Sequence, residues 1–124
     1  MILVLEDEAP VMRLLRHILK NYQVIEAATA EQALRHFGER QHQVDLLIAD
    51  VNLPASSGIE VALRARSETP ALPVILTSGY PVSGWGPGHA AEFERLGWAG
   101  VKVVQKPFLP RAILDAIREL ADPS

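Results

Sequence analysis

The sequence contains no cysteine, so it has neither a disulfide framework nor a thiolate metal site. This fits a reducing compartment, and we expect the protein in the cytoplasm. A long apolar run is also missing. The apolar stretch at residues 1–5 meets acidic residues at once, has no basic leader, and is far too short for a signal peptide or a spanning helix. We therefore expect no membrane association.

An excess of basic charge is absent as well. The formal net charge is −3 at pH 7, and lysine and arginine form no run that could follow a phosphate backbone. We therefore expect no direct contact with nucleic acid. What is present is typical of a folded domain, because 48% of the 124 residues are hydrophobic and this length supports one core.

Short apolar runs rich in β-branched residues alternate with amphipathic helical patterns. Strands are predicted at residues 2–5, 23–25, 44–49, 74–76 and 101–104. Helices are predicted from about residue 10 to 20, 30 to 38, 59 to 66, 90 to 96 and 110 to 120. This alternation predicts an α/β fold, a doubly wound five-stranded parallel sheet with five helices on its two faces.

Polar residues stand at the carboxyl ends of four predicted strands. They are Glu6 with Asp7, Asp50, Thr77 with Ser78, and Lys106. In a doubly wound sheet the ligand site lies outside the carboxyl ends of the strands, near the switch point in strand order. We therefore expect these residues, which are far apart in the sequence, to be neighbours in space.

The residue types at these strand ends favour phosphoryl transfer. Glu6, Asp7 and Asp50 together concentrate negative charge that requires a cation, and carboxylates with water are the ligands that Mg²⁺ prefers. Lys106 adds a positive charge that would pair with an anion or with Asp50. Acids, metal, lysine and the two hydroxyl groups suit attack of a carboxylate on phosphorus, which gives an acyl phosphate on aspartate.

At these residues the sequence resembles a response-regulator receiver domain, the CheY-like domain of two-component signalling. The matching segments are residues 2–8 (first strand and acidic pair), 45–58 (phospho-acceptor segment, with proline four and glycine eight residues after the aspartate), 74–78 (switch-hydroxyl strand) and 105–108 (lysine-proline motif). The resemblance runs from end to end of the chain. It implies a flavodoxin-like sheet of order 2-1-3-4-5, a receiver domain at residues 1–121, and a tail or the start of a linker at residues 122–124.

The resemblance implies that Asp50 accepts a phosphoryl group from a phosphohistidine of a partner. That partner would be a sensor histidine kinase or a histidine phosphotransfer protein. The implied Mg²⁺ site consists of Asp50 itself, Asp7 as a direct ligand, Glu6 through water, and Asn52 through its backbone carbonyl.

Three further roles follow from the same resemblance. Lys106 would hold a phosphoryl oxygen, Thr77 would move toward the phosphate as the trigger, and the backbone amide of Ser78 would help to bind the phosphoryl group. The switch would bias the face formed by the fourth helix, fifth strand and fifth helix, which would bind a downstream protein or a second copy of the chain. Such a protein is no enzyme in the usual sense, because it catalyses only its own phosphorylation and dephosphorylation.

The sequence departs from the family pattern in several places. Val103 stands where the family often carries an aromatic residue three positions before the lysine, so coupling between Thr77 and the output face would follow another route. The segment between Thr77 and Lys106 is some residues longer than usual, and it contains a Gly/Pro-rich loop at residues 78–88. Trp85 in this loop would either contact a partner or cover the loop. Ser57 replaces a frequent acid, a change that we expect to be mild, and we expect Trp98 in the core or packed on a helix.

Two other functions remain open at this point. Val103 and the unusual loop are compatible with a receiver-like interaction module that takes no phosphate. A magnesium-dependent phosphohydrolase with an aspartyl nucleophile is the other alternative, but such enzymes usually carry a second aspartate where Asn52 stands. Taken alone, Asp50 would be read as a turn residue; the combination of four polar strand ends favours the phosphorylated receiver.

Overall fold

The structure, a computed structural model, describes residues 1–40 and 43–121. Strands and helices alternate along the chain as predicted. The elements are β1 (Ile2–Leu5), α1 (Ala9–Ile18), β2 (Val24–Ala27), α2 (Ala30–Arg40), β3 (Leu46–Asp50), α3 (Gly58–Glu68), β4 (Val74–Ser78), the 3₁₀ helix η1 (Val82–Gly84), α4 (Pro87–Leu96), β5 (Val101–Gln105) and α5 (Pro110–Ala121). The segment at 122–124, predicted as a tail or linker, lies outside the described residues.

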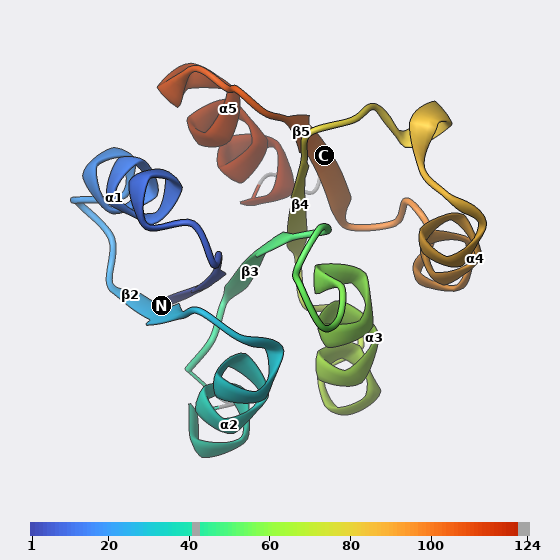
Figure 1. Cartoon of the computed structure of the whole chain (residues 1–124). Helices are drawn as coiled ribbons and strands as arrows, with labels where there is room; N and C mark the ends of the chain where they lie inside the picture. The colour runs from blue at the N-terminus through green and yellow to red at the C-terminus, as the bar shows by residue number, and fades with distance from the viewer. Residues whose placement is uncertain (41–42, 122–124) are drawn as a thin grey trace.

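The strands form one parallel sheet of order β2-β1-β3-β4-β5, as the resemblance implied. Helices α1 and α5 cover one face, and α2, α3 and α4 cover the other (Figure 1). The strand order reverses direction at β1 and β3, so the carboxyl ends of these two strands border the crevice where such sheets bind ligands. Within the described residues, no helix combines the length and the apolar character needed to cross a bilayer.

The core has one layer on each side of the sheet. Leu3, Leu5 and Leu47 belong to the layer under α2, α3 and α4, whereas Val4 and Ile48 belong to the layer under α1 and α5. Side chains alternate between the two faces along each strand, and both faces are covered. This explains why the inner strands have continuous apolar sequences.

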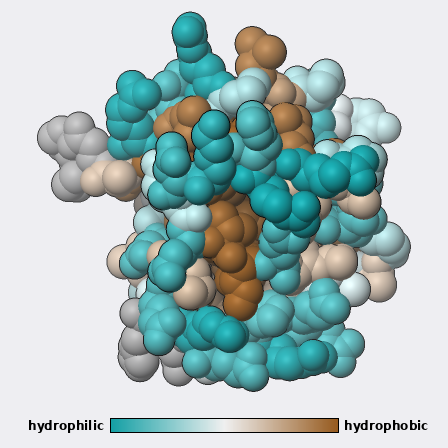
Figure 2. Space-filling view, turned by 90° about the vertical axis from the view of Figure 1, so that its left-hand side faces the viewer, coloured by the Kyte–Doolittle hydropathy of each residue, from teal (hydrophilic) through white to brown (hydrophobic). Residues whose placement is uncertain are grey.

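The edge strand β2 is less completely covered than the inner strands. Its residues Val24 and Ile25 are only half-buried. Figure 2 views the side of the molecule formed by α1, β2 and α2, where a strip of hydrophobic surface lies between hydrophilic side chains. Because only one neighbouring strand pairs with β2, its apolar residues stay partly open to solvent.

Several predicted boundaries were wrong. Strand β2 covers Val24–Ala27 instead of 23–25, and β3 covers Leu46–Asp50 instead of 44–49. Asp50 is therefore the last residue of β3, held in the ladder opposite Thr77, rather than the first residue of a turn. Helix α1 ends at Ile18 instead of about residue 20.

The ends of two other helices also differ from the prediction. Helix α2 runs through Gly38 to Arg40, because an exposed glycine weakens a helix without stopping it. Helix α4 begins at Pro87 instead of residue 90, since proline fits the first turn, where its missing N–H costs nothing. The predicted start of α2 is confirmed: the Gln32 amide donates to Thr29 Oγ1 at 3.1 Å, and Gln32 Oε1 accepts from the Ala28 amide at 2.8 Å.

Arg66 joins the end of α3 to the two loops beside β4. Its Nε donates to the Leu72 carbonyl at 2.9 Å, and its terminal nitrogen donates to the carbonyls of Ala99 (2.9 Å) and Gly100 (3.2 Å). Gly100 has a φ of +69°, and a Cβ there would lie 2.9 Å from this guanidinium. The contact fixes the end of the sheet opposite to the polar strand ends.

Gly58 allows α3 to lie directly against the end of β3. A Cβ at this position would meet the Asp50 carbonyl oxygen at 2.4 Å and Ala49 Cβ at 2.7 Å. Gly58→Ala should therefore lower the free energy of unfolding by about 1–3 kcal/mol through overpacking, measured by urea titration. Gly38→Ala is the control, since an added Cβ meets open space there, and it should raise stability by about 0.5–1 kcal/mol. Equal stability of the two variants would contradict this account.

Candidate functional site

Asp50 lies at the centre of the polar edge of the sheet. Its side chain is 2% exposed, and each carboxylate oxygen is bound by one donor. Oδ1 accepts from the Asn52 amide at 2.9 Å, and Oδ2 accepts from Lys106 Nζ at 2.9 Å. The carboxylate at the end of β3 is therefore fixed in orientation by the turn that follows it and by the ammonium group of Lys106, which follows the edge strand β5.

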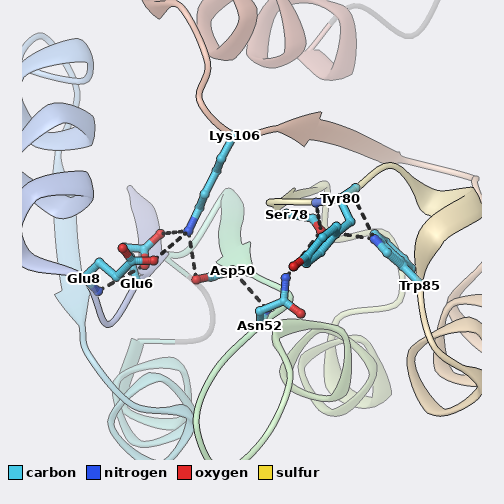
Figure 3. A network of polar contacts seen from close by, with 8 residues as sticks. All are labelled: Glu6, Glu8, Asp50, Asn52, Ser78, Tyr80, Trp85 and Lys106. Carbon is cyan, nitrogen blue, oxygen red and sulfur yellow. Dashed lines mark hydrogen bonds and ion pairs between the residues drawn. The ribbon is translucent and has the colours of Figure 1, made fainter.

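Lys106 reaches this carboxylate from the loop after β5. Its amide donates to the Ser78 carbonyl at 2.7 Å, and its peptide bond to Pro107 is cis. Figure 3 shows the side chain descending between Asp50 and the acidic pair Glu6 and Glu8. Nζ lies 2.9 Å from Glu6 Oε1 and 3.7 Å from Glu8 Oε1.

The pKa values of this cluster reflect burial opposed by charge. Burial alone would lower the pKa of Lys106, but its close pairing with the Glu6 and Asp50 carboxylates raises it, so the amine is protonated. Burial raises the pKa of Glu6 to about 7, helped by the charge of Asp50 and opposed by Lys106 and by the Glu8 amide. Burial therefore favours the protonated form of Glu6 more strongly than in an exposed glutamate.

The carboxylates at this edge fit a divalent cation. Glu6, Asp7, Glu8 and Asp50 each offer an oxygen, and these atoms lie within 4.8 Å of one another. Glu6 Oε1 is buried without a hydrogen-bond partner, although it lies at ion-pair distance from Lys106. One lysine cannot neutralise this many carboxylates, and hard oxygen ligands of this kind suit Mg²⁺.

Glu8 was missed as a member of this cluster. In the sequence it reads only as an acid that closes β1, whereas its exposed side chain returns toward Lys106 and the other carboxylates. The run of three acids at residues 6–8 was the available signal. The ligand roles expected for Asp7, and for the backbone carbonyl of Asn52, stay predictions.

Thr77 and Ser78 end β4 beside the acceptor strand, and both are buried. Thr77 pairs with Asp50 in the ladder, and its carbonyl accepts from the Val51 amide at 2.8 Å. The hydroxyl of Ser78 accepts from the Tyr80 amide (3.1 Å), Trp85 Nε1 (3.1 Å) and Asn52 Nδ2 (3.4 Å). Its side chain thus closes the following loop, while the proposed role of its amide stays a prediction.

The two tryptophans behave differently from each other. Trp85 is half-buried and donates to Ser78 and to the Tyr80 carbonyl, so it covers the loop, one of its two expected roles, while a contact with a partner stays a prediction. Trp98 is 59% exposed, so it does not lie in the core, the first of its two expected places. The second, packing on a helix, is confirmed, because its ring meets Phe93 of α4 edge to face with centroids 4.7 Å apart.

Two departures from the family pattern are accommodated in the structure. Ser57 caps α3: its hydroxyl accepts from the Glu60 amide at 3.1 Å and donates to Glu92 of α4 at 2.7 Å. A serine thus satisfies the first turn of the helix, a task that an acidic side chain also performs. Val103 is half-buried against the core layer under α2, α3 and α4.

Comparison with known proteins places this arrangement in a family. The model of the response regulator receiver domain matches residues 2–118. The chain is 40% identical over 111 residues to the response regulator GtcR of Aneurinibacillus migulanus, covering 88% of this chain and 42% of that protein. It is 34% identical over 122 residues to the transcriptional regulatory protein ResD of Bacillus subtilis, covering 96% of this chain and 47% of that protein. The chain thus spans less than half the length of these two relatives.

Solved structures share the fold over almost the whole chain. The receiver domain of NtrX from Brucella abortus superposes with a TM-score of 0.81 at 25% identity and 100% coverage of both chains. The receiver domain of the hybrid histidine kinase CckA gives a TM-score of 0.78 at 28% identity and 98% coverage of both chains. The chain therefore belongs to the response regulator receiver domains of two-component systems.

Proposed function

We propose that this receiver domain, spanning residues 1–121, accepts a phosphoryl group on Asp50 from a phosphohistidine of a cytoplasmic partner. The partner would be a sensor histidine kinase or a histidine phosphotransfer protein. The observation that carries the proposal is the buried Asp50 carboxylate, bound at Oδ2 by Lys106 and surrounded by further carboxylates. A purely structural aspartate at a strand end requires neither the lysine nor the additional acids.

In the proposed reaction a carboxylate oxygen of Asp50 attacks phosphorus, and an aspartyl O–P bond forms. The P–N bond of the phosphohistidine breaks, and its electron pair returns to the imidazole of the partner. Lys106 Nζ, 2.9 Å from Asp50 Oδ2, lies where it would bind a phosphoryl oxygen and offset its charge. The backbone amide of Ser78, at the end of β4, would donate to a second phosphoryl oxygen.

A Mg²⁺ ion held by Glu6, Asp7 and Asp50, with the Asn52 carbonyl, would supply charge neutralisation and orient the phosphoryl oxygens. Glu8 lies close enough to join this set or to bind one of its waters. The protein itself fixes the orientation of the attacking carboxylate, because the backbone amide of Asn52 donates to Asp50 Oδ1.

The consequence of phosphorylation would be a change in a protein-binding surface. Thr77 lies beside Asp50 in the sheet and would move toward the phosphoryl group. The responding surface would be formed by α4, β5 and α5, which would bind a downstream protein or a second copy of the chain.

Acceptance of the phosphoryl group can be measured by intact mass. Incubation with acetyl phosphate and Mg²⁺ should add one phosphoryl group to the wild type, and a chelator should prevent it. Asp50→Asn should abolish the adduct, because an amide is a poor nucleophile for this reaction. Asp45→Asn is the matched control, since Asp45 lies before the other end of β3 and pairs with the Met1 amino group at the surface. Labelling of Asp50→Asn equal to that of the wild type would refute the assignment. A folded wild type without adduct would favour the alternative of a receiver-like interaction module that takes no phosphate.

Removal of the Asp7 charge should weaken metal binding. Asp7→Asn is expected to raise the dissociation constant for Mg²⁺ about tenfold, equivalent to about 1.4 kcal/mol, because one carboxylate of the cluster is lost. Isothermal titration of the unphosphorylated protein gives this value directly. Asp115→Asn, at a surface pair with Arg118 on α5, should bind Mg²⁺ as the wild type does. An unchanged constant for Asp7→Asn would argue against its role as a ligand.

The raised pKa of Glu6 predicts a pH-dependent stability of the metal-free protein. Folding raises this pKa from 4.5 to about 7, so between these values the folded state keeps a proton that the unfolded chain releases. The stabilisation from Glu6 is fully present below the lower value and is lost as pH rises through the higher one. Urea titrations in chelator should show this fall for the wild type, and Glu6→Gln should lack it. Glu31→Gln, on the exposed first turn of α2, should keep the wild-type slope; a wild-type slope in Glu6→Gln would contradict the prediction.

A further inference from the structure

The loop between β4 and α4 is closed by the indole of Trp85. Its Nε1 donates to Ser78 Oγ at 3.1 Å and lies 3.2 Å from the Tyr80 carbonyl. The 3₁₀ turn at Val82–Gly84 brings the tryptophan back toward the strand, with the Trp85 amide donating to the Val82 carbonyl at 3.1 Å. The side chain therefore lies against the end of β4, as Figure 3 shows.

Trp85 is connected through Ser78 to the segment that carries Asp50. Asn52 Nδ2 approaches the same serine oxygen at 3.4 Å, and the Asn52 amide holds Asp50 Oδ1 at 2.9 Å. A hydroxyl oxygen has two lone pairs, so the shorter contacts from the Tyr80 amide and Trp85 fix Ser78, and the longer contact from Asn52 is the weakest. The position of Ser78 beside the acceptor thus depends on the loop.

The other side of Trp85 contacts α4. Its ring meets Phe93 edge to face, with centroids 5.3 Å apart and an interplanar angle of 89°. Phe93 is buried and meets Trp98 in the same way at 4.7 Å and 83°. These aromatic pairs form a continuous path from the buried Ser78 hydroxyl to a tryptophan exposed at the surface after α4.

The alternation of side chains along β4 explains why Ser78 begins this path. Val74 and Leu76 point into the core layer under α2, α3 and α4, whereas Ile75 points into the layer under α1 and α5. The period of two places Ser78 on the α4 side and Thr77 on the other. Val103 also faces the α4 layer, but a valine has no group that can bond to a hydroxyl.

We infer that Trp85 is a positioning residue: its indole N–H holds Ser78 at the acceptor edge, and its ring transmits the position of Ser78 through Phe93 to α4 and Trp98. The transmission part of this inference rests on the proposed phosphorylation of Asp50. The positioning part does not, because it concerns contacts that are present without phosphate.

The positioning part is tested without any phosphoryl donor. In a Trp98→Phe protein Trp85 is the single tryptophan, and there Ser78→Ala should shift its emission maximum. Loss of one net hydrogen bond should also speed amide exchange at residues 79–86 and in α4 about fivefold. Ser67→Ala is the matched control, since Ser67 Oγ donates to Arg64 within α3, and it should change neither signal. Unchanged emission and exchange in Ser78→Ala would overturn the inference.

The transmission part is tested with Trp85→Phe, which keeps an aromatic ring against Phe93 but removes the N–H. Acetyl phosphate and Mg²⁺ are added, and the change in α4 amide exchange is divided by the phosphorylated fraction from intact mass. This response per phosphorylated molecule should fall at least about twofold in Trp85→Phe, because the loss of one net hydrogen bond changes an equilibrium by at least about this factor. The response should persist in Val103→Ala.

The outcomes separate the two proposals. An undiminished response per phosphorylated molecule in Trp85→Phe, or a response lost only in Val103→Ala, would overturn the inference while leaving the proposed function intact. Absence of any adduct in the wild type would instead refute the proposed function, and the Ser78→Ala experiment would still decide the role of Trp85.

Discussion

The acceptor edge depends on one ammonium group, Lys106 Nζ. It lies 2.9 Å from both Asp50 Oδ2 and Glu6 Oε1, and so joins the ends of β1 and β3 to the loop after β5. Both carboxylates are buried, and a buried charge without a partner is strongly destabilising. The same lysine that permits these acids to lie together is also the cation that would bind a phosphoryl oxygen, so stability and reactivity at this edge would have a common origin.

Much of the fold and of this site could be predicted from the sequence. The inner strands are covered on both faces, so their apolar runs are unambiguous, and parallel topology then brings Glu6, Asp50 and Lys106 to one edge. The ends of β2 and α4 were less predictable. An edge strand is only half-buried, and the Gly/Pro-rich loop before Pro87 carries a weak helical pattern.

The remaining details of the site depend on loop conformation, which residue spacing does not encode. Glu8 joins the carboxylate cluster because the chain turns back after β1, as its amide donates to Glu6 at 3.1 Å. Trp85 reaches Ser78 only because a 3₁₀ turn intervenes. Neither contact follows the period of a helix or a strand. The departure at Val103 was visible in the sequence, whereas the aromatic contacts of Trp85 and Trp98 with Phe93 depend on how the loop and α4 fold.

The clamp formed by Arg66 has a mechanical consequence for α4. Its guanidinium binds Ala99 and Gly100, in the turn that leaves α4, and its Nε binds Leu72 beside the start of β4. One end of the α4 segment is therefore anchored to α3, while the other end follows the loop that leaves the acceptor edge. Ser57 at the start of α3 adds a second attachment, through Glu92 in the middle of α4. The first turn of α4, at Pro87, precedes both attachments, so a small displacement at the acceptor edge would move this turn more than the end of the helix.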